Sequence, residues 1–148
     1  MSVTTRRAAL DDLDVVAPLF DAYRQFYGQP SDMARARAWL SDRMQQGESV
    51  VLVAECNGRP NGFVQLYPMF SSVRTARLWI LNDLFVASDA RRSGVARALL
   101  DAAAQFARDD GAAGLMLETG RDNASARALY RAAGWQEDTS QWYSLPLR

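Results

Sequence analysis

The chain has 148 residues, of which 49% are hydrophobic and 23% charged, as expected of one ordinary globular domain. Seventeen basic residues balance seventeen acidic ones, so no overall charge favours nucleic acid or membranes as partners. Every basic residue is an arginine and there is no histidine. This excludes a Ser-His-Asp triad, a Schiff-base or P-loop lysine and a metal site with histidine ligands.

The first half of the chain predicts four strands and two helices. Ser31 or Asp32 can cap the second helix, and the turn "NGRPNG" joins two strands into a hairpin. In chain order the elements are a strand at 3–8, helices at 11–27 and from about 32 to 45, a hairpin of strands at 49–56 and 63–67, and, after a loop at 68–72, a long strand at 75–86.

The second half predicts a β-α-β unit with a parallel crossover, followed by a helix and a closing strand. Gly111 and Gly134 are placed to end the two helices, and Asn123 to cap the second. The elements are a helix at 94–108, a strand at 114–119, a helix at 124–133 and a strand at 142–147. The order β-α-α-β-β-β-α-β-α-β predicts an α/β fold with a mixed sheet and helices on both faces, in one domain over residues 1–148.

Cysteine usage and the N-terminus indicate the compartment. Cys56 is the only cysteine, so no internal disulfide can form, and its place after an apolar strand favours a small buried side chain. The N-terminal segment has no apolar signal core, and no run reaches membrane-spanning length. We therefore expect a cytoplasmic protein.

The stretch "VASDARRSGVARALL" places two arginines and a glycine at the start of a helix. A helix N-terminus carries unpaired N–H groups and a partial positive charge, and Gly94 lets a ligand approach the backbone. The glycine spacing of dinucleotide-binding loops and the P-loop pattern are both missing. The stretch predicts an anion site, against the alternative of a solvated helix cap.

Two motifs in this part of the chain carry a family resemblance. Arg91, Gly94 and Ala96 match the pattern Arg-x-x-Gly-x-Ala after an apolar strand, and "ETGRDNASARALYRAAGW" matches a downstream Asn, Ala, Leu-Tyr and Gly-aromatic signature. In these motifs and in its element order the chain resembles the GNAT superfamily of acetyl-CoA-dependent N-acetyltransferases. The resemblance implies a three-layer fold whose fourth strand splays from the fifth, and a direct acetyl transfer to a primary amine in a ternary complex.

The resemblance also implies where acetyl-CoA binds, without a metal. The pantetheine arm is expected on the strand before the helix, the pyrophosphate on the N–H groups from Arg92 to Arg97, and the thioester near Asn123 and Ala126. For Asn123, helix capping is the simpler role. The implied cofactor-binding residues are Leu84, Phe85, Val86, Arg91, Arg92, Ser93, Gly94, Val95, Ala96, Arg97, Asn123 and Ala126.

The resemblance names Tyr130 as the group whose hydroxyl serves the departing thiolate, against a role in packing. An alkylammonium with a pKa near 10.4 must lose a proton before it attacks, and a carboxylate, often through water, is the candidate base. Asp83 lies inside an apolar strand, where burial is costly unless it has partners or lines a cleft. Glu118 precedes Tyr130 at the spacing of the base assigned in some ribosomal-protein acetyltransferases. Asp83, Glu118 and water all stay open.

Segments "LNDLFV", "FYGQPSD" and "QLYPMFSS" resemble the branch with polyamine and histone acetyltransferases. Polyamine enzymes carry an acidic pair where this chain has Asn82 and Asp83, so one charge is missing here. Tyr27, and less strongly Tyr67 and Phe70, are expected to border the acceptor cleft, where aromatic rings suit amines. The acceptor is expected to be a small amine or an amino-acid derivative. A protein or peptide amine, or a non-catalytic acyl-CoA-binding module, is the alternative.

Small GNAT proteins commonly dimerise, and the terminal strand "WYSLPLR" could lie at or cross an interface. We therefore expect a homodimer, although Pro146 argues against long edge pairing.

Overall fold

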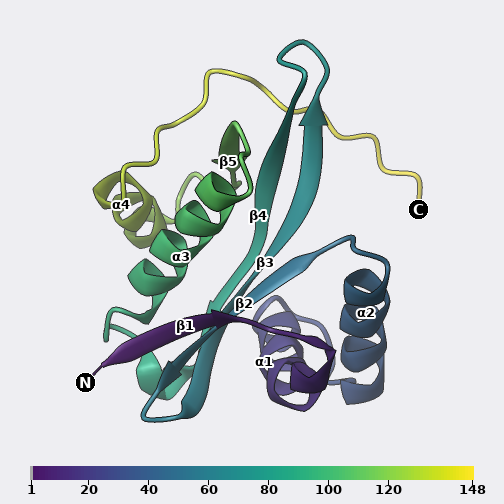
Figure 1. The fold of residues 1–148 in the computed structure, drawn as a ribbon, viewed down its shortest axis with the longest axis vertical. Helices are drawn as coiled ribbons and strands as arrows, with labels where there is room; N and C mark the ends of the chain where they lie inside the picture. The colour runs from purple at the N-terminus through teal and green to yellow at the C-terminus, as the bar shows by residue number, and fades with distance from the viewer. Residues whose placement is uncertain (1) are drawn as a thin grey trace. The chain divides into compact units, whose positions relative to one another are not determined.

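The computed structural model describes residues 2–148 and divides the chain into two compact units, Met1–Glu118 and Thr119–Arg148, each described here by itself. Short 3-10 turns at Leu10–Asp12 and Ser88–Ala90 precede α1 and α3. The first unit contains β1 (Val3–Arg7), α1 (Leu13–Phe26), α2 (Met33–Gln45), β2 (Val50–Cys56), β3 (Arg59–Ser71), β4 (Ala76–Val86), α3 (Val95–Asp109) and β5 (Gly114–Met116), and the second contains α4 (Ala124–Ala132) (Figure 1).

The five strands form one sheet in the order β1-β2-β3-β4-β5, with every pair antiparallel except the parallel pair β4–β5. This confirms the mixed sheet expected from the sequence. The predicted turn at 57–62 is shorter than expected, since only Asn57 and Gly58 separate β2 from β3, both with positive φ (53° and 74°). β3 also extends through most of the predicted loop at 68–72, because residues 68–71 pair with the start of β4.

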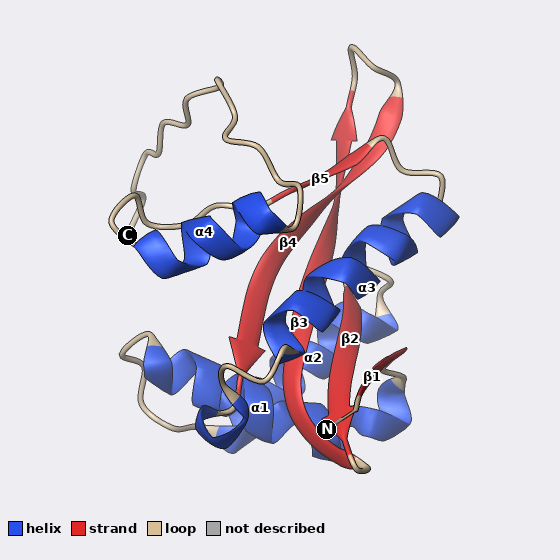
Figure 2. Ribbon diagram, turned by 90° about the vertical axis from the view of Figure 1, so that its left-hand side faces the viewer, coloured by secondary structure: helices blue, strands red, loops and turns tan. Residues whose placement is uncertain are grey.

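Helices cover both faces of the sheet, with α1 and α2 on one side and α3 on the other (Figure 2). On the first side, Val16, Phe20 and Leu40 pack with Val53 and Phe63 of the sheet in one buried cluster. Side chains alternate between the two faces of a strand, so the buried residues that alternate with Val53 along β2 point toward α3. The apolar face of α3, with Leu99 and Ala103 fully buried, covers that side.

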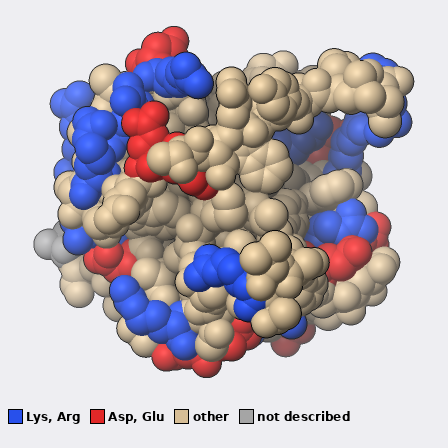
Figure 3. Space-filling view, turned by 90° about the horizontal axis from the view of Figure 1, so that it is seen from above, with Lys and Arg blue, Asp and Glu red and all other residues tan. Residues whose placement is uncertain are grey.

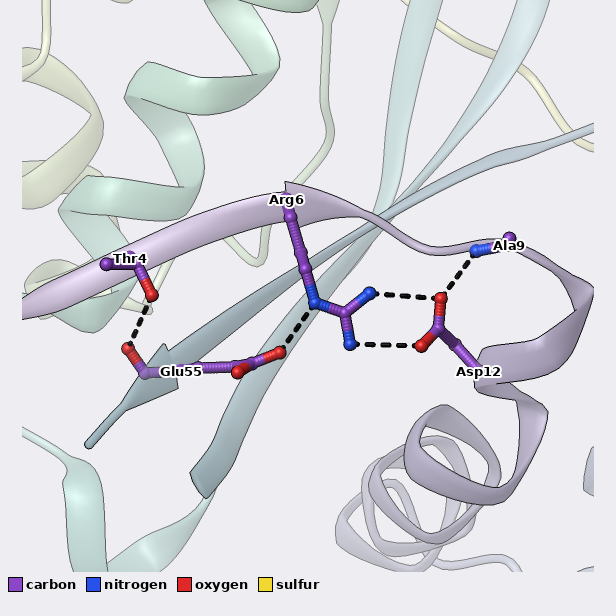
Figure 4. A network of polar contacts seen from close by, with 5 residues as sticks. All are labelled: Thr4, Arg6, Ala9, Asp12 and Glu55. Atoms are coloured by element: carbon purple, nitrogen blue, oxygen red, sulfur yellow. Dashed lines mark hydrogen bonds and ion pairs between the residues drawn. The ribbon is translucent and has the colours of Figure 1, made fainter. Parts of the chain in front are cut away.

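A polar network joins β1 to β2 and to the turn before α1 (Figure 4). Arg6 Nε donates to Glu55 Oε1 (2.7 Å), while its two terminal nitrogens donate to the two oxygens of Asp12 (both 3.0 Å). Ala9 N also donates to Asp12 Oδ2 (2.7 Å). The hydrogen bonds from Arg6 and Ala9 lower the pKa of the Asp12 carboxyl. This network fixes the path of the chain as it leaves the edge strand for α1.

The pairing of β4 changes at Asn82. Gln65 pairs with Asp83 but Leu66 pairs with Leu81, so Asn82 is an extra residue on β4, which makes a β-bulge. On the other edge, β5 pairs with β4 only from Leu78 to Ile80. Pairing between β4 and β5 thus ends at Ile80, two residues before the bulge in the β3–β4 pairing.

α3 approaches the sheet closely at Gly62 of β3. A Cβ atom at this position would lie 3.0 Å from Phe85 O, 3.0 Å from Val95 Cγ1 and 3.2 Å from Leu99 Cδ1. Only a residue without a side chain leaves room for the first turn of α3 here. Gly62 therefore sets where the N-terminus of α3 stands relative to the end of β4.

In the second unit the structure confirms one prediction and corrects another. Asn123 caps α4, since its Oδ1 accepts a hydrogen bond from Ala126 N (3.3 Å). The expected strand at 142–147 is not formed, and Trp142, Tyr143, Leu145 and Leu147 are 65–89% exposed. A strand needs a neighbour to pair its backbone groups, and this segment is given none. In the first unit, the expected strand at 114–119 is shorter than predicted, because β5 ends at Met116.

Among residues 2–148, no helix is both long and apolar enough to cross a membrane. The same residues contain no group of three or more histidine, cysteine, aspartate or glutamate side chains that could hold a metal ion.

Candidate active site

The loop before α3 has the backbone shape of an anion site. Arg92 and Gly94 both adopt left-handed conformations (φ 64° and 84°), and Gly94 is the N-cap of α3. The first helical hydrogen bond runs from Ala98 N to Gly94 O (3.0 Å), so the N–H groups of residues 95–97 precede the helical ladder. Space is open where a Gly94 side chain would project. These features fit the pyrophosphate of acetyl-CoA.

The side chains of this loop are engaged to different degrees. The Ser93 hydroxyl donates to Ala90 O, Val95 is buried in the core, and Arg97 Nε donates to Asp101 Oδ1 (3.1 Å). Arg91 is directed toward α1, since its Nε donates to Val86 O (3.1 Å) and its guanidinium carbon lies 5.5 Å from the centre of the Phe26 ring. Arg92 is exposed and Ala96 is partly exposed.

The end of β4 leaves one edge unpaired. Pairing with β5 stops at Ile80, so residues 81–86, apart from the bulged Asn82, have a strand partner on the β3 side only, within the described part of the chain. Leu84 and Val86 are partly exposed along this stretch, while Phe85 is buried against the α1 side. Free N–H and C=O groups on an edge can pair with an extended amide chain such as pantetheine.

Asp83 lies one residue beyond the bulge, with only 5% of its surface exposed. Its Oδ2 accepts a hydrogen bond from Gln65 Nε2 (2.6 Å), and its Oδ1 accepts one from Asn82 Nδ2 (3.0 Å). The Tyr23 hydroxyl of α1 also hydrogen-bonds to it. Burial raises the pKa of the Asp83 carboxyl, and these hydrogen bonds offset the rise only in part.

Aromatic residues surround this carboxyl on the α1 and α2 side. Burial and the nearby Asp83 raise the pKa of the Tyr23 hydroxyl, and burial raises that of Tyr67. Tyr67 Oη accepts a hydrogen bond from Trp39 Nε1 of α2 (3.4 Å). Tyr23 packs edge-on against Phe85, with ring centres 6.1 Å apart. The cluster therefore combines one buried carboxyl with hydroxyl and ring surfaces, which suits a cationic or hydrogen-bond-donating ligand.

Sequence reasoning missed Tyr23 and Gln65. Gln65 is fully buried within β3, and its Oε1 has no hydrogen-bond partner among the described residues. A lone glutamine inside the apolar run "FVQLY" was the same kind of signal that drew attention to Asp83. Tyr23 carried no such signal, because it stands at the helical spacing of core residues.

The remaining predicted residues are spread over both units. In the first unit, Asn82 and Glu118 are exposed, and Tyr27 is 66% exposed with its ring 5.1 Å from that of Tyr23. Phe70 is 67% exposed near the tip of the β3–β4 hairpin, away from the Asp83 contacts. The structure thus brings Tyr27, Tyr67 and Asn82 together with Asp83 but not Phe70.

In the second unit, Asn123 and Ala126 form the first turn of α4, and Tyr130 lies one turn further along. The Tyr130 ring is partly exposed and packs near Trp135, with ring centres 6.3 Å apart. Trp135 N donates to Tyr130 O (2.9 Å), which secures the end of α4.

Charged side chains of both signs lie on the face of the molecule that is drawn in Figure 3. On the face drawn in Figure 3, basic and acidic side chains are interspersed around uncharged residues. The anion site considered above rests on the local backbone geometry before α3.

Comparison with known proteins identifies the family. The model of the acetyltransferase (GNAT) family matches residues 16–135, and the chain belongs to this family. It is 49% identical over 134 residues to an uncharacterised N-acetyltransferase, YhfO, of Bacillus subtilis (strain 168), covering 90% of each chain. A crystal structure of a probable acetyltransferase superposes with a TM-score of 0.92 at 42% identity over 100% of this chain and 99% of that one. The protein is therefore an N-acetyltransferase, as the resemblance implied.

A second solved structure names a more specific reaction. Ribosomal-protein-alanine N-acetyltransferase from Brucella melitensis biovar Abortus 2308 has a TM-score of 0.81 and 25% identity, covering 99% of this chain and 100% of that one. GNAT enzymes use acetyl-CoA as co-substrate, and the open β4 edge and the loop before α3 fit that molecule.

Proposed function

We propose that this N-acetyltransferase transfers the acetyl group of acetyl-CoA to the primary amine of a small molecule or amino-acid derivative, by direct attack in a ternary complex. The observation that carries the proposal is the β-bulge in β4 at Asn82. Around this bulge one edge of β4 has no strand partner among the described residues, and the residue after the bulge is the buried carboxyl Asp83, which faces Tyr23 of α1. The strand proposed to bind the pantetheine arm of acetyl-CoA thus also carries Asp83, the carboxyl proposed to bind the amine.

Asp83 binds the acceptor amine and receives its proton, directly or through water. Its raised pKa supports this role, because a carboxylate that holds a proton more strongly is a better general base. Gln65 Oε1, buried beside it and without a partner among the described residues, is an acceptor for an N–H donor. Glu118, which is exposed just beyond β5, is the alternative base.

The part of the acceptor that binds at Asp83 carries one positive charge. Asn82 is neutral, so the acidic pair of the polyamine branch is reduced to Asp83 alone. Tyr27 and Tyr67 provide ring and hydroxyl surface for the rest of the acceptor. A single buried carboxyl favours a monoamine over a polycation. The likeness to a ribosomal-protein-alanine N-acetyltransferase favours a peptide N-terminus as the second candidate acceptor.

On the thioester side, Tyr130 protonates or stabilises the departing thiolate, and Asn123 and Ala126 flank the thioester. The pyrophosphate lies on the loop from Arg91 to Arg97, and the pantetheine arm along Leu84, Phe85 and Val86. The positions of Tyr130 and Asn123 in the matched family signature support these roles. The enzyme is a single domain, acts in the cytoplasm and assembles as a homodimer.

A panel of acceptors tests the function. The purified enzyme is given acetyl-CoA with polyamines, alkyl monoamines, amino acids, their amides, and short peptides with an N-terminal alanine. Release of the CoA thiol is then followed with a chromogenic reagent. We expect turnover with monoamines or amino-acid derivatives and little with polyamines. Binding of CoA without turnover for any acceptor would instead identify a non-catalytic acyl-CoA-binding module.

Two variants in the same assay separate binding from chemistry. Gly94→Asp adds a charged side chain at a left-handed position of the anion loop, so calorimetry should show loss of CoA binding in a folded protein. Tyr130→Phe should keep CoA binding but reduce kcat about a hundredfold to ten-thousandfold, the usual cost of losing a positioned proton donor. A kcat within about threefold of wild type would remove Tyr130 from the mechanism.

A further inference from the structure

Arg91 contacts residues on two sides of the site at once. Its Nε donates to Val86 O at the end of β4 (3.1 Å). Its guanidinium carbon lies 5.5 Å from the centre of the Phe26 ring and 5.8 Å from that of Phe85. These distances are within the range of cation–π interactions. One arginine of the loop before α3 therefore joins the end of β4 to the last residue of α1.

Phe26 begins a chain of ring contacts that leads to Asp83. The Phe26 ring packs edge-on against Tyr27 (5.3 Å between centres), and Tyr27 packs edge-on against Tyr23 (5.1 Å). The Tyr23 hydroxyl hydrogen-bonds to Asp83. The side chains of Phe26 and Tyr27 are both about two-thirds exposed, while Tyr27 N donates to Arg24 O (3.1 Å) at the end of α1.

We propose that Arg91 is a positioning residue that couples acetyl-CoA binding to the acceptor side of the site. It orders the segment from the end of α1 to the start of α2 when CoA is bound. The inference rests on the proposed CoA site, and it assigns the Arg91 side chain a task separate from holding phosphate.

The backbone of the loop explains the coupling. Arg91 is extended (φ −68°, ψ 150°) and is followed by the left-handed Arg92 and, two residues later, the left-handed Gly94. An anion on the N–H groups that follow holds this backbone in one conformation, and a chain paired along β4 holds Val86 in place. Both anchors of the Arg91 side chain are then fixed, so its guanidinium stays against Phe26. By linkage, order at Phe26 strengthens CoA binding by the same factor.

Hydrogen–deuterium exchange tests this with CoA itself as the probe and needs no known acceptor. In the wild type at saturating CoA, amides of residues 24–32 should exchange about two- to fivefold more slowly than without CoA, the factor that an exposed cation–π contact can supply. Arg91→Ala, at a CoA concentration that calorimetry shows to be saturating, should lose this protection. Phe26→Leu removes the ring but keeps an apolar side chain, and it should lose the protection with Arg91 intact.

Arg92→Ala is the matched control, because it removes the neighbouring arginine without changing the contacts between Arg91 and Phe26. It should weaken CoA binding yet keep the protection of residues 24–32 once CoA is saturating. With an active acceptor, Arg91→Ala and Phe26→Leu should each raise the acceptor KM about two- to fivefold with less change in kcat. The double variant should be no worse than either single one.

The outcomes separate this inference from the proposed function. If CoA binds the wild type but residues 24–32 exchange at the same rate with and without it, the coupling is wrong while the CoA site stands. The same holds if Arg91→Ala or Phe26→Leu keeps full protection. If CoA does not bind the wild type, the proposed CoA site and this inference fall together.

Discussion

Asp83 shows how one residue acquires its chemistry from its surroundings. The same carboxyl on the surface would be an ordinary acid, but here it is 5% exposed and held by Gln65, Asn82 and Tyr23. Burial disfavours the charged form and the hydrogen bonds favour it, and burial has the larger effect. The folded protein therefore binds a proton at Asp83 more strongly than the unfolded chain does.

Asp83→Asn should reveal this in the pH dependence of stability. Because the pKa of Asp83 is raised above its ordinary value of 3.8, the wild type loses stability as pH rises from below 3.8 through the raised pKa. The asparagine variant has no such titration. Measured by urea titration, the free energy of unfolding of the variant should therefore increase relative to that of the wild type between acid and neutral pH, which means that the variant becomes relatively more stable. A difference that does not change with pH would contradict a raised pKa.

The same Asp83→Asn variant should lose activity although it gains stability relative to the wild type at neutral pH. If Asp83 binds the amine and takes its proton, Asp83→Asn should lose most of its kcat/KM with any acceptor. The acid limb of the wild-type profile of kcat/KM against pH should lie above the range of an ordinary carboxylate. An asparagine variant with wild-type activity would assign the base to Glu118 or to water.

At the scale of elements, the contact between α3 and β3 sets the position of the anion loop. The added methyl group in Gly62→Ala would meet a backbone oxygen and two core side chains at 3.0–3.2 Å. Overpacking of this kind costs about 1–3 kcal/mol. We expect a loss of stability of that size by urea titration and weaker CoA binding by calorimetry, because the first turn of α3 must shift.

Gly114→Ala in β5 provides the matched control. A methyl group there would meet only Leu78 Cδ2 at 3.8 Å, an ordinary contact distance. Both variants exchange a strand glycine for alanine, so the difference between them isolates the close approach of α3. Equal stability and equal CoA affinity in the two variants would show that α3 is not held by this contact.

At the scale of the whole molecule, the last residues of the chain are the basis of the proposed dimer. Trp142, Tyr143, Leu145 and Leu147 are largely exposed, and their backbone belongs to no strand. Exposed large apolar side chains gathered in one segment are typical of a contact with another molecule. A chain shortened by residues 141–148 should be monomeric by light scattering at micromolar concentration, and the full chain dimeric. A full-length monomer would contradict the proposal.

A double substitution controls for the possibility that the shortened chain does not fold. Leu145→Ser with Leu147→Ser keeps the chain length and removes only apolar surface, so it should also weaken the dimer. Circular dichroism and CoA binding check that each variant is folded.

Much of the fold was predictable because its signals are local. Asp32 and Asn123 cap α2 and α4 through hydrogen bonds to residues three positions on, within the same short stretch of sequence. Apolar spacing located the helices, and the anion loop was visible as arginines and a glycine before a helix. The expectation of a strand at 142–147 was wrong for the opposite reason, since a strand depends on a partner that local pattern does not supply.

By itself, the sequence determined the order of the elements from β1 to α4, the family and the positions of its two motifs, because spacing, capping and turn residues act over a few positions. Only the tertiary structure decided that Asn82 is a bulge, that Tyr23 and Gln65 surround Asp83, and that Arg91 is directed toward Phe26. These features depend on strand register and on contacts between residues far apart in the chain. Such contacts are set by the packing of both helix layers on one sheet, which no local pattern encodes.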